Sequence, residues 1–279
     1  MQHKNRFKTI VGLWTVTLLL WSNILSAAPQ AELIPFWSHS NEANRARIDH
    51  STWQAILNRY LDAKHPSGIN RFNYANLKVN AADKRKFKGY LKSLMKVDPR
   101  TYSKAEQKAY WINLYNALTV HLIIKRYPVD SIKDIKSGLF SSGPWDKKLV
   151  KIQGQKLTLN NIEHGILRPI WGDNRIHYAV NCASLGCPNL ASQAYTAANM
   201  EQLLEAGAKA YVNHSRGVQF KNGKLLVSSI YHWYKVDFGG NDRGVIRHLL
   251  KYADGGLKSR LRAYRGGIDH HYDWRLNQP

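Results

Sequence analysis

Cys182 and Cys187 are the only cysteines of the chain, and they lie five positions apart. A covalent hydrolase needs its nucleophile on a turn of small residues, where the backbone of a substrate can approach. Cys182 fits this requirement better than Cys187, because Pro188 directly follows Cys187. We therefore expect Cys182 to be the nucleophile of a thiol hydrolase or acyltransferase that acts on amide or isopeptide bonds of small or cell-wall peptides.

A catalytic thiol also needs an imidazole that holds it as thiolate, and a polar group that orients the imidazole. His177 and His164 precede Cys182 in the chain, and either of them could be the base. Glu163 is the expected orienting group, although its position three residues after Asn160 is equally typical of a helix cap. The backbone donors of the two residues after Cys182 would form the oxyanion hole.

The same cysteines could instead form a disulfide. In an oxidising compartment this pair would close a tight loop, and so short a loop constrains the unfolded chain only modestly. A zinc site built from His164, His177, Cys182 and Cys187 is a third alternative. Their spacing matches no zinc finger or ribbon, and no His-Glu-x-x-His sequence occurs, so we expect neither a metal nor another cofactor.

The N-terminal segment has the three regions of a secretory signal: a basic start, an apolar run over 9–21 and the small residues Ser26-Ala27-Ala28. The apolar run is shorter than the roughly 20 residues that span a bilayer. We therefore expect residues 1–28 to be a signal peptide, and the chain to be periplasmic or otherwise exported to the cell envelope. No transmembrane span would then remain, whereas an uncleaved inner-membrane anchor is the alternative.

The chain is strongly basic, with a formal net charge of +22. Such a charge favours anionic partners, here a small anionic peptide or an anionic envelope polymer. Nucleic acid is not expected, because no helix-turn-helix, zinc-finger or aromatic RNA-binding signature accompanies the charge. A second class of function therefore competes with the enzyme. It is a non-catalytic envelope binding module, with a Cys182–Cys187 disulfide and a basic surface for an anionic polymer.

Hydrophobic periodicity indicates the elements that must position these residues. It predicts helices over about 41–63, 80–95, 103–126, 160–167, 200–212 and 244–252. Strand patterns cover 148–152, 156–159, 175–181, 218–221 and 224–227, and the tail after 257 could add an edge strand. Asn222-Gly223 predicts a hairpin turn between the last two of the five strands.

The helix predicted over 103–126 is apolar nearly all round, so we expect it to be central. Asn113 and Asn116 lie one turn apart on it, although asparagine is a poor helix former. Either they hold neighbouring loops by buried hydrogen bonds, or they bind substrate.

Five segments resemble the bacterial, exported branch of the domain of unknown function 547 family. They are 110–117 (YWINLYNA), 127–129 (YPV), 159–168 (LNNIEHGILR), 175–188 (RIHYAVNCASLGCP) and 233–238 (WYKVDF). The resemblance covers about residues 100–240 and implies an exported α/β domain. The shared polar residues that it implies are Asn113, Asn116, Glu163, His164, Arg168, His177, Cys182, Ser184 and Cys187.

In this set we expect catalysis by Cys182, His177, Glu163 and His164, and substrate binding by Asn113, Asn116, Arg168 and Ser184. The set is similar in kind to that of papain-like and transglutaminase-like thiol enzymes. The predicted fold is a single mixed α/β (α+β) domain over 29–279, with a central apolar helix packed on a small, largely antiparallel sheet.

Overall fold

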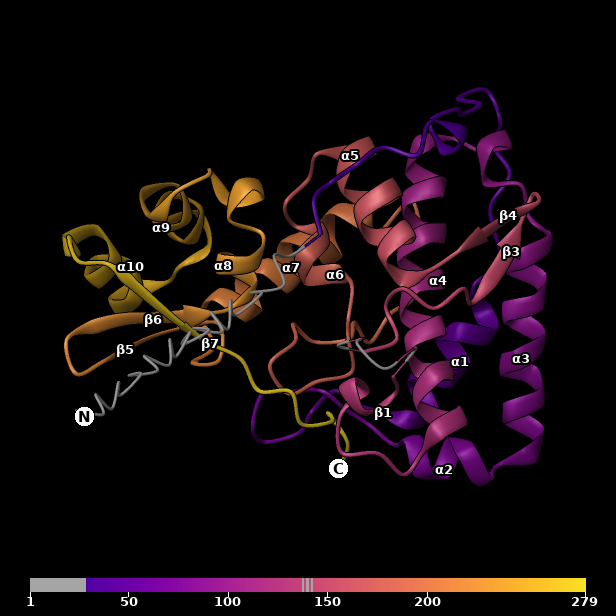
Figure 1. Cartoon of the computed structure of the whole chain (residues 1–279), viewed down its shortest axis with the longest axis horizontal. Coiled ribbons are helices and arrows are strands. Elements are labelled where there is room, and N and C mark those ends of the chain that lie inside the picture. The colour runs from indigo at the N-terminus through magenta and orange to yellow at the C-terminus, as the bar shows by residue number, and fades with distance from the viewer. Residues whose placement is uncertain (1–28, 137, 139–140, 142) are drawn as a thin grey trace, which may run out of the picture.

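The computed structural model describes residues 29–136, 138, 141 and 143–279 of the chain (Figure 1). The predicted signal segment, residues 1–28, lies outside the described residues, and its cleavage therefore stays a prediction. Within the described part, no helix combines the length and the hydropathy needed to cross a bilayer.

Helix α4 (Lys104–Arg126) is buried along most of its length, which confirms the predicted central helix. Its main neighbours are α2 (Tyr74–Val79), α3 (Ala81–Lys96) and the π-helix η4 (Asn161–Leu167), and α3 also packs against α1 (Ser51–Tyr60). The mixed fold class is confirmed, but the neighbours of the central helix are chiefly helices, and the sheets are small.

The segment before α1 differs from its prediction, because the helix expected from residue 41 begins only at Ser51. The N-terminal cap of α4 explains part of this difference. The Ser103 hydroxyl accepts the N–H of Glu106 at 3.4 Å, whereas the Glu106 carboxylate accepts the N–H of Ile48 at 2.7 Å. This contact holds the chain around residue 48 against α4, where its N–H group is unavailable for a helical bond.

Three small sheets accompany the helices. The pairs β1 (Leu61–Asp62) with β2 (Arg71–Phe72) and β3 (Val150–Ile152) with β4 (Gln155–Leu157) are antiparallel, and the third sheet has the order β5 (Val218–Lys221), β6 (Lys224–Ser228), β7 (Ile268–His271). Asn222 and Gly223 have φ of 50° and 77°, so the predicted hairpin turn is confirmed. The tail adds β7 as an edge strand parallel to β6.

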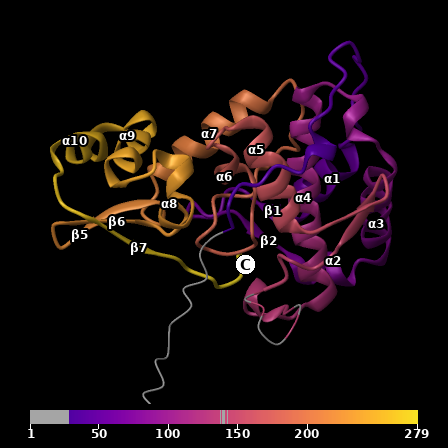
Figure 2. The ribbon, with the colours of Figure 1, turned by 45° about the horizontal axis from the view of Figure 1, so that its top comes forward.

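The remaining helices are α5 (Arg168–Trp171), α6 (Ile176–Ala179), α7 (Met200–Val212), α8 (Ile230–Trp233), α9 (Asp242–Tyr252) and α10 (Gly255–Ala263), with 3₁₀ turns η1 (Pro35–Trp37), η2 (Pro99–Thr101), η3 (Ile132–Asp134) and η5 (Lys235–Phe238). The structure confirms the helices predicted over 200–212 and 244–252, although α10 follows the latter. Both views place α8–α10 and the three-stranded sheet at one end and α1–α4 at the other, with α5–α7 between them (Figure 1, Figure 2).

The strand predicted over 175–181 is wrong, because this segment forms the single helical turn α6. Asp173 accepts the N–H of Arg175 through its side chain at 2.9 Å and that of Ile176 through its backbone at 3.1 Å. Val180 then bonds back to the carbonyl of Ile176. A short, continuously buried apolar run does not distinguish a strand from a buried helical turn by periodicity.

Candidate functional site

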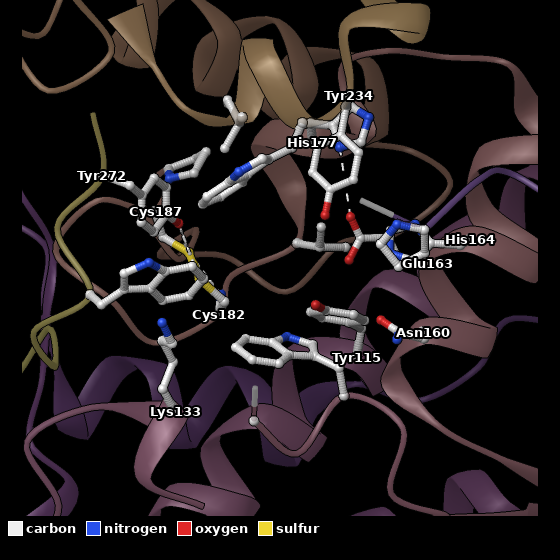
Figure 3. A pocket seen from close by; sticks show the side chains of 18 of the residues that line it. Tyr115, Lys133, Asn160, Glu163, His164, His177, Cys182, Cys187, Tyr234 and Tyr272 are labelled. Carbon is white, nitrogen blue, oxygen red and sulfur yellow. Dashed lines mark hydrogen bonds and ion pairs between the residues drawn. A yellow bond between two sulfur atoms is a disulfide. The ribbon is translucent and has the colours of Figure 1, made fainter. Parts of the chain in front are cut away.

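A pocket of about 360 Å³ lies where α4, η4, the cysteine loop and the C-terminal tail meet (Figure 3). Aromatic rings form much of its wall. Its lining residues are Pro29, Tyr115, Lys133, Gly143, Trp145, Asp146, Asn160, Glu163, His164, His177, Val180, Cys182, Cys187, Pro188, Ile230, Trp233, Tyr234, Tyr272 and Trp274. The pocket thus contains all four residues predicted to be catalytic.

His177 lies between two carboxylates at one side of the pocket. Its Nε2 is 2.7 Å from Oδ2 of Asp237, and its Nδ1 is 3.6 Å from Oε1 of Glu163. Burial by itself would lower the pKa of His177, but the hydrogen bonds and charges of Asp237 and Glu163 outweigh it and raise this pKa. The ring also stacks on Tyr234, with centroids 4.3 Å apart. The two carboxylates and the stacked ring therefore fix the orientation of His177 and favour its protonated form.

Glu163 is a buried, ionised carboxylate. Burial would raise the pKa of Glu163, but the rings of His164 and His177 and the hydroxyl of Tyr115 lower it to about 2. Glu163 and His164 are consecutive residues of η4, and both line the pocket. π-helical turns are rare in proteins, and those that occur are often found at functional sites.

Arg168 connects Asp237 and His164 on the side away from the pocket lining. Its Nε donates to Oδ2 of Asp237 at 2.6 Å, and one terminal nitrogen donates to the backbone oxygen of Pro29 and contacts Nδ1 of His164 at 3.1 Å. Because arginine has no acceptor, Nδ1 of His164 must accept, and the ring proton lies on Nε2. Burial and the charge of Arg168 lower the pKa of His164 against the opposing charge of Glu163, which favours the neutral ring, and this ring lines the pocket.

Partly exposed aromatic rings line the opposite side. Trp274 packs against Trp233, Trp145 and Tyr272, with centroids between 4.6 and 5.7 Å apart. The ammonium of Lys133 lies 5.2 Å from the ring centre of Trp274. This wall presents flat apolar faces beside one exposed cation.

Cys182 and Cys187 form a disulfide in the wall. The hydroxyl of Tyr272 lies 3.2 Å from each sulfur, and the hydroxyl of Ser184 lies 3.3 Å from that of Cys182. The N–H of Ala183, expected in an oxyanion hole, donates instead to the Asn181 side chain at 2.8 Å. The disulfide and the Glu163–His164 pair lie at opposite sides of the view in Figure 3. In the disulfide form, Cys182 has no thiol to act as a nucleophile.

The residues predicted to bind substrate lie outside the pocket lining. Asn113 donates to the backbone oxygen of Tyr195 and accepts its N–H, at 2.7 and 3.0 Å. Asn116 bridges the oxygen of Ala179 and the N–H of Asn181 in the same way, at 2.9 and 2.8 Å. Both asparagines therefore clamp loops, the first of the two roles expected for them. Arg168 and Ser184 stand directly behind lining residues.

Asp237 is the site residue that the sequence prediction missed. It belongs to the segment 233–238, which carries part of the family resemblance, and that segment was the available signal. Nothing local indicated its partner, because Asp237 and His177 are 60 positions apart. The aromatic wall was missed for the same reason, since its rings come from distant segments.

Within the described residues, no group of three or more His, Cys, Asp or Glu side chains could hold a metal ion.

Comparison with known proteins finds a resemblance to one family over part of the chain and no activity. No curated protein and no solved structure matches the chain. The analogy with papain-like and transglutaminase-like enzymes, and the bacterial exported branch, therefore stay predictions. Glu163, His164, Arg168, His177 and both cysteines fall within the matched segment, whereas Asp237 lies beyond it. Residues 99–212 match the family described as "Protein of unknown function, DUF547", so the chain resembles this family over that segment.

Proposed function

We propose that the chain is an exported binding module whose pocket takes a short anionic peptide of the cell envelope. The observation that carries the proposal is the composition of the pocket wall, which combines aromatic rings with a few polar groups. Partly exposed rings of Trp145, Trp233 and Trp274 line the same pocket as the cation of Lys133 and the imidazole of His164. Flat apolar faces with a few placed polar groups are typical of sites for small organic ligands.

The size and charge of the pocket support a peptide of a few residues. Its volume of about 360 Å³ falls at the lower end of the range of about 300–1,000 Å³ for ligand sites. Glu163 is paired with His177, and the carboxylate of Asp146 accepts from the amide of Asn160, so Lys133 is the cation left to pair with a ligand carboxylate. The net charge, +22 for the whole chain and +19 without the three basic residues of 1–28, would attract anionic ligands over longer distances.

Titration with short acidic peptides, followed by tryptophan fluorescence and calorimetry, tests this proposal. Lys133→Ala should weaken binding about two- to fivefold, which corresponds to an exposed ion pair of about 1 kcal/mol at most. Trp274→Ala should weaken it further, because a ring contact and its apolar area are lost. Lys136→Ala is the matched control, since Lys136 is exposed nearby but does not line the pocket. Equal affinity in all variants would contradict the proposal.

A second candidate is a cysteine-dependent hydrolase or acyltransferase that acts on an amide bond of such a peptide. The specific observation in its favour is that Cys182 lines the same pocket as His164 and Glu163. This candidate requires the disulfide to open first, because a thiolate is the nucleophile.

Peptide hydrolysis measured with and without reductant tests the second candidate. The oxidised chain should be inactive, and Cys187→Ser should be active without reductant because Cys182 is then a permanent thiol. Cys182→Ser, in which the other cysteine is free, is the matched control and should be inactive. If reduced Cys182 releases no product from any acidic peptide that binds, the hydrolase is excluded and the binding module stands.

A further inference from the structure

The two sulfurs of the disulfide have unequal surroundings. Two donors approach Sγ of Cys187: the backbone N–H of Cys182 at 2.9 Å and the phenol of Tyr272 at 3.2 Å. The phenol is equally far from Sγ of Cys182, so the backbone N–H is the donor that distinguishes Cys187. Cys182 is partly exposed at the pocket, whereas Cys187 is 3% exposed and is followed by Pro188. An attacking group can therefore approach Cys182, while Cys187 has groups that would stabilise a negative charge.

This arrangement matches the demands of thiol–disulfide exchange. An attacking thiolate forms a bond to one sulfur, and the other sulfur leaves with the electron pair. Donors preorganised around a developing anion stabilise it without further reorganisation. Burial raises the pKa of Tyr272. The phenol therefore stays protonated and can donate a hydrogen bond to the leaving sulfur.

The loop does not depend on the disulfide for its position. Leu185 and Gly186 donate backbone N–H groups to Arg275 and Asp273, both at 2.8 Å. Tyr211 donates its hydroxyl to the carbonyl of Gly186 at 2.6 Å, and Asn181 donates to that of Pro188 at 2.8 Å. A disulfide that spans five positions restricts the unfolded chain less than one that closes a long loop. The loop can therefore lose the bond and keep its conformation.

We propose that Cys182–Cys187 is an exchangeable disulfide, at which a low-molecular-weight thiol entering the pocket attacks Cys182 and Cys187 leaves as thiolate. A bond forms between the incoming sulfur and Cys182, and the bond between the two cysteines breaks. A second molecule of the thiol then attacks the incoming sulfur. This attack joins the two small thiols in a disulfide, which is released, and Cys182 leaves as a thiolate. Two thiols are oxidised and one protein disulfide is reduced. This inference does not rest on peptide binding.

The site of attack is tested with single-cysteine variants and glutathione disulfide. Cys187→Ser should take up one glutathione at Cys182, detected by intact mass, at least tenfold faster than Cys182→Ser takes it up at Cys187. Uptake that is faster at Cys187, or equal at both positions, would overturn the assignment. This comparison needs no change at Tyr272 and stays decisive if variants of that residue fold poorly.

The role of the phenol is tested by the rate at which reduced glutathione opens the disulfide of the folded protein. Tyr272→Phe keeps the ring but removes the donor, so the rate should fall at least about tenfold, the lower end of the scale for one hydrogen bond to a charged group. Tyr102→Phe, away from the sulfurs, is the control. An unchanged rate in Tyr272→Phe would overturn the role of the phenol. A disulfide that is reduced only when the protein unfolds, as followed by circular dichroism during the reaction, would show that it is a structural staple.

Discussion

Oδ2 of Asp237 lies 2.7 Å from Nε2 of His177 and 2.6 Å from Nε of Arg168. One carboxylate oxygen thus meets two buried cations, whose side chains are 2% and 3% exposed. Removing one partner of a buried ion pair leaves the other as an uncompensated charge, which costs far more than losing an exposed pair. Asp237 is therefore the residue on which the charge balance of the site depends.

Asp237→Asn should lower the free energy of unfolding by about 3–5 kcal/mol. Urea unfolding at neutral pH measures this loss. Asp269→Asn removes an exposed carboxylate 4.0 Å from Lys224 and should change stability by less than about 0.5 kcal/mol. A similar small effect in Asp237→Asn would contradict the assigned role.

The same network predicts a pH dependence. The pKa of His177 is raised above its ordinary 6.5, so its contribution to stability is complete below about pH 6.5 and is lost as the pH rises through the raised value. The pKa of Glu163 is lowered from 4.5 to about 2, so its contribution is complete above about pH 4.5 and is lost as the pH falls towards 2. The network therefore contributes most between about pH 4.5 and 6.5.

Unfolding of the wild type and Asp237→Asn across a pH series isolates this contribution, because the other groups are shared. The difference between the two free energies should be largest within that window. It should shrink above the window as His177 loses its proton, and below it as Asp237, whose pKa is lowered from its ordinary 3.8, gains one. A difference that is constant with pH would show that the network does not titrate as described.

Asn116→Ala should destabilise the fold by about 2–4 kcal/mol, because it leaves a buried N–H and a buried carbonyl without their partner. Thermal unfolding measures the loss. Asn58→Ala, on the exposed face of α1, is the control and should cost less than about 0.5 kcal/mol. If Asn116→Ala instead weakens peptide binding without loss of stability, the clamp is not its main role.

Two glycines should respond oppositely to alanine. Gly223 has φ of +77° in the hairpin turn, so Gly223→Ala should cost about 1 kcal/mol. Gly89 is exposed in α3, and a Cβ there meets no atom within 4 Å, so Gly89→Ala should add up to about 1 kcal/mol. Chemical denaturation of both variants checks the two signs, and a stabilising Gly223→Ala would contradict the turn.

Export is a prediction from residues 1–28 alone. We expect the processed chain in the envelope fraction, with its new N-terminus identified by mass spectrometry. Leu19→Arg should retain the chain in the cytosol, because a charge interrupts the apolar run. Leu33→Arg, just beyond the predicted signal, is the control and should leave export unchanged. Full-length wild-type chain in the cytosol would contradict the prediction.

The sequence by itself determined the elements whose signals are local. The apolar surface of α4, the periodicity of α3 and α7, and the Asn222-Gly223 turn each depend on neighbours a few positions away. Their predictions were confirmed because such preferences act within one helical turn or one hairpin. The cysteine pair was identified in the same way, with a nucleophile, a disulfide and a zinc site as its three alternatives.

Only the tertiary structure decided the chemistry of the site. The segment over 175–181 is buried on all sides, so its periodicity could not distinguish a strand from the turn that Asp173 caps. Asp237 reaches His177 across 60 positions, and Tyr272 reaches the sulfur of Cys187 across 85. Such pairings arise from the packing of distant segments, and it is this packing that determines which charges and donors surround each reactive group.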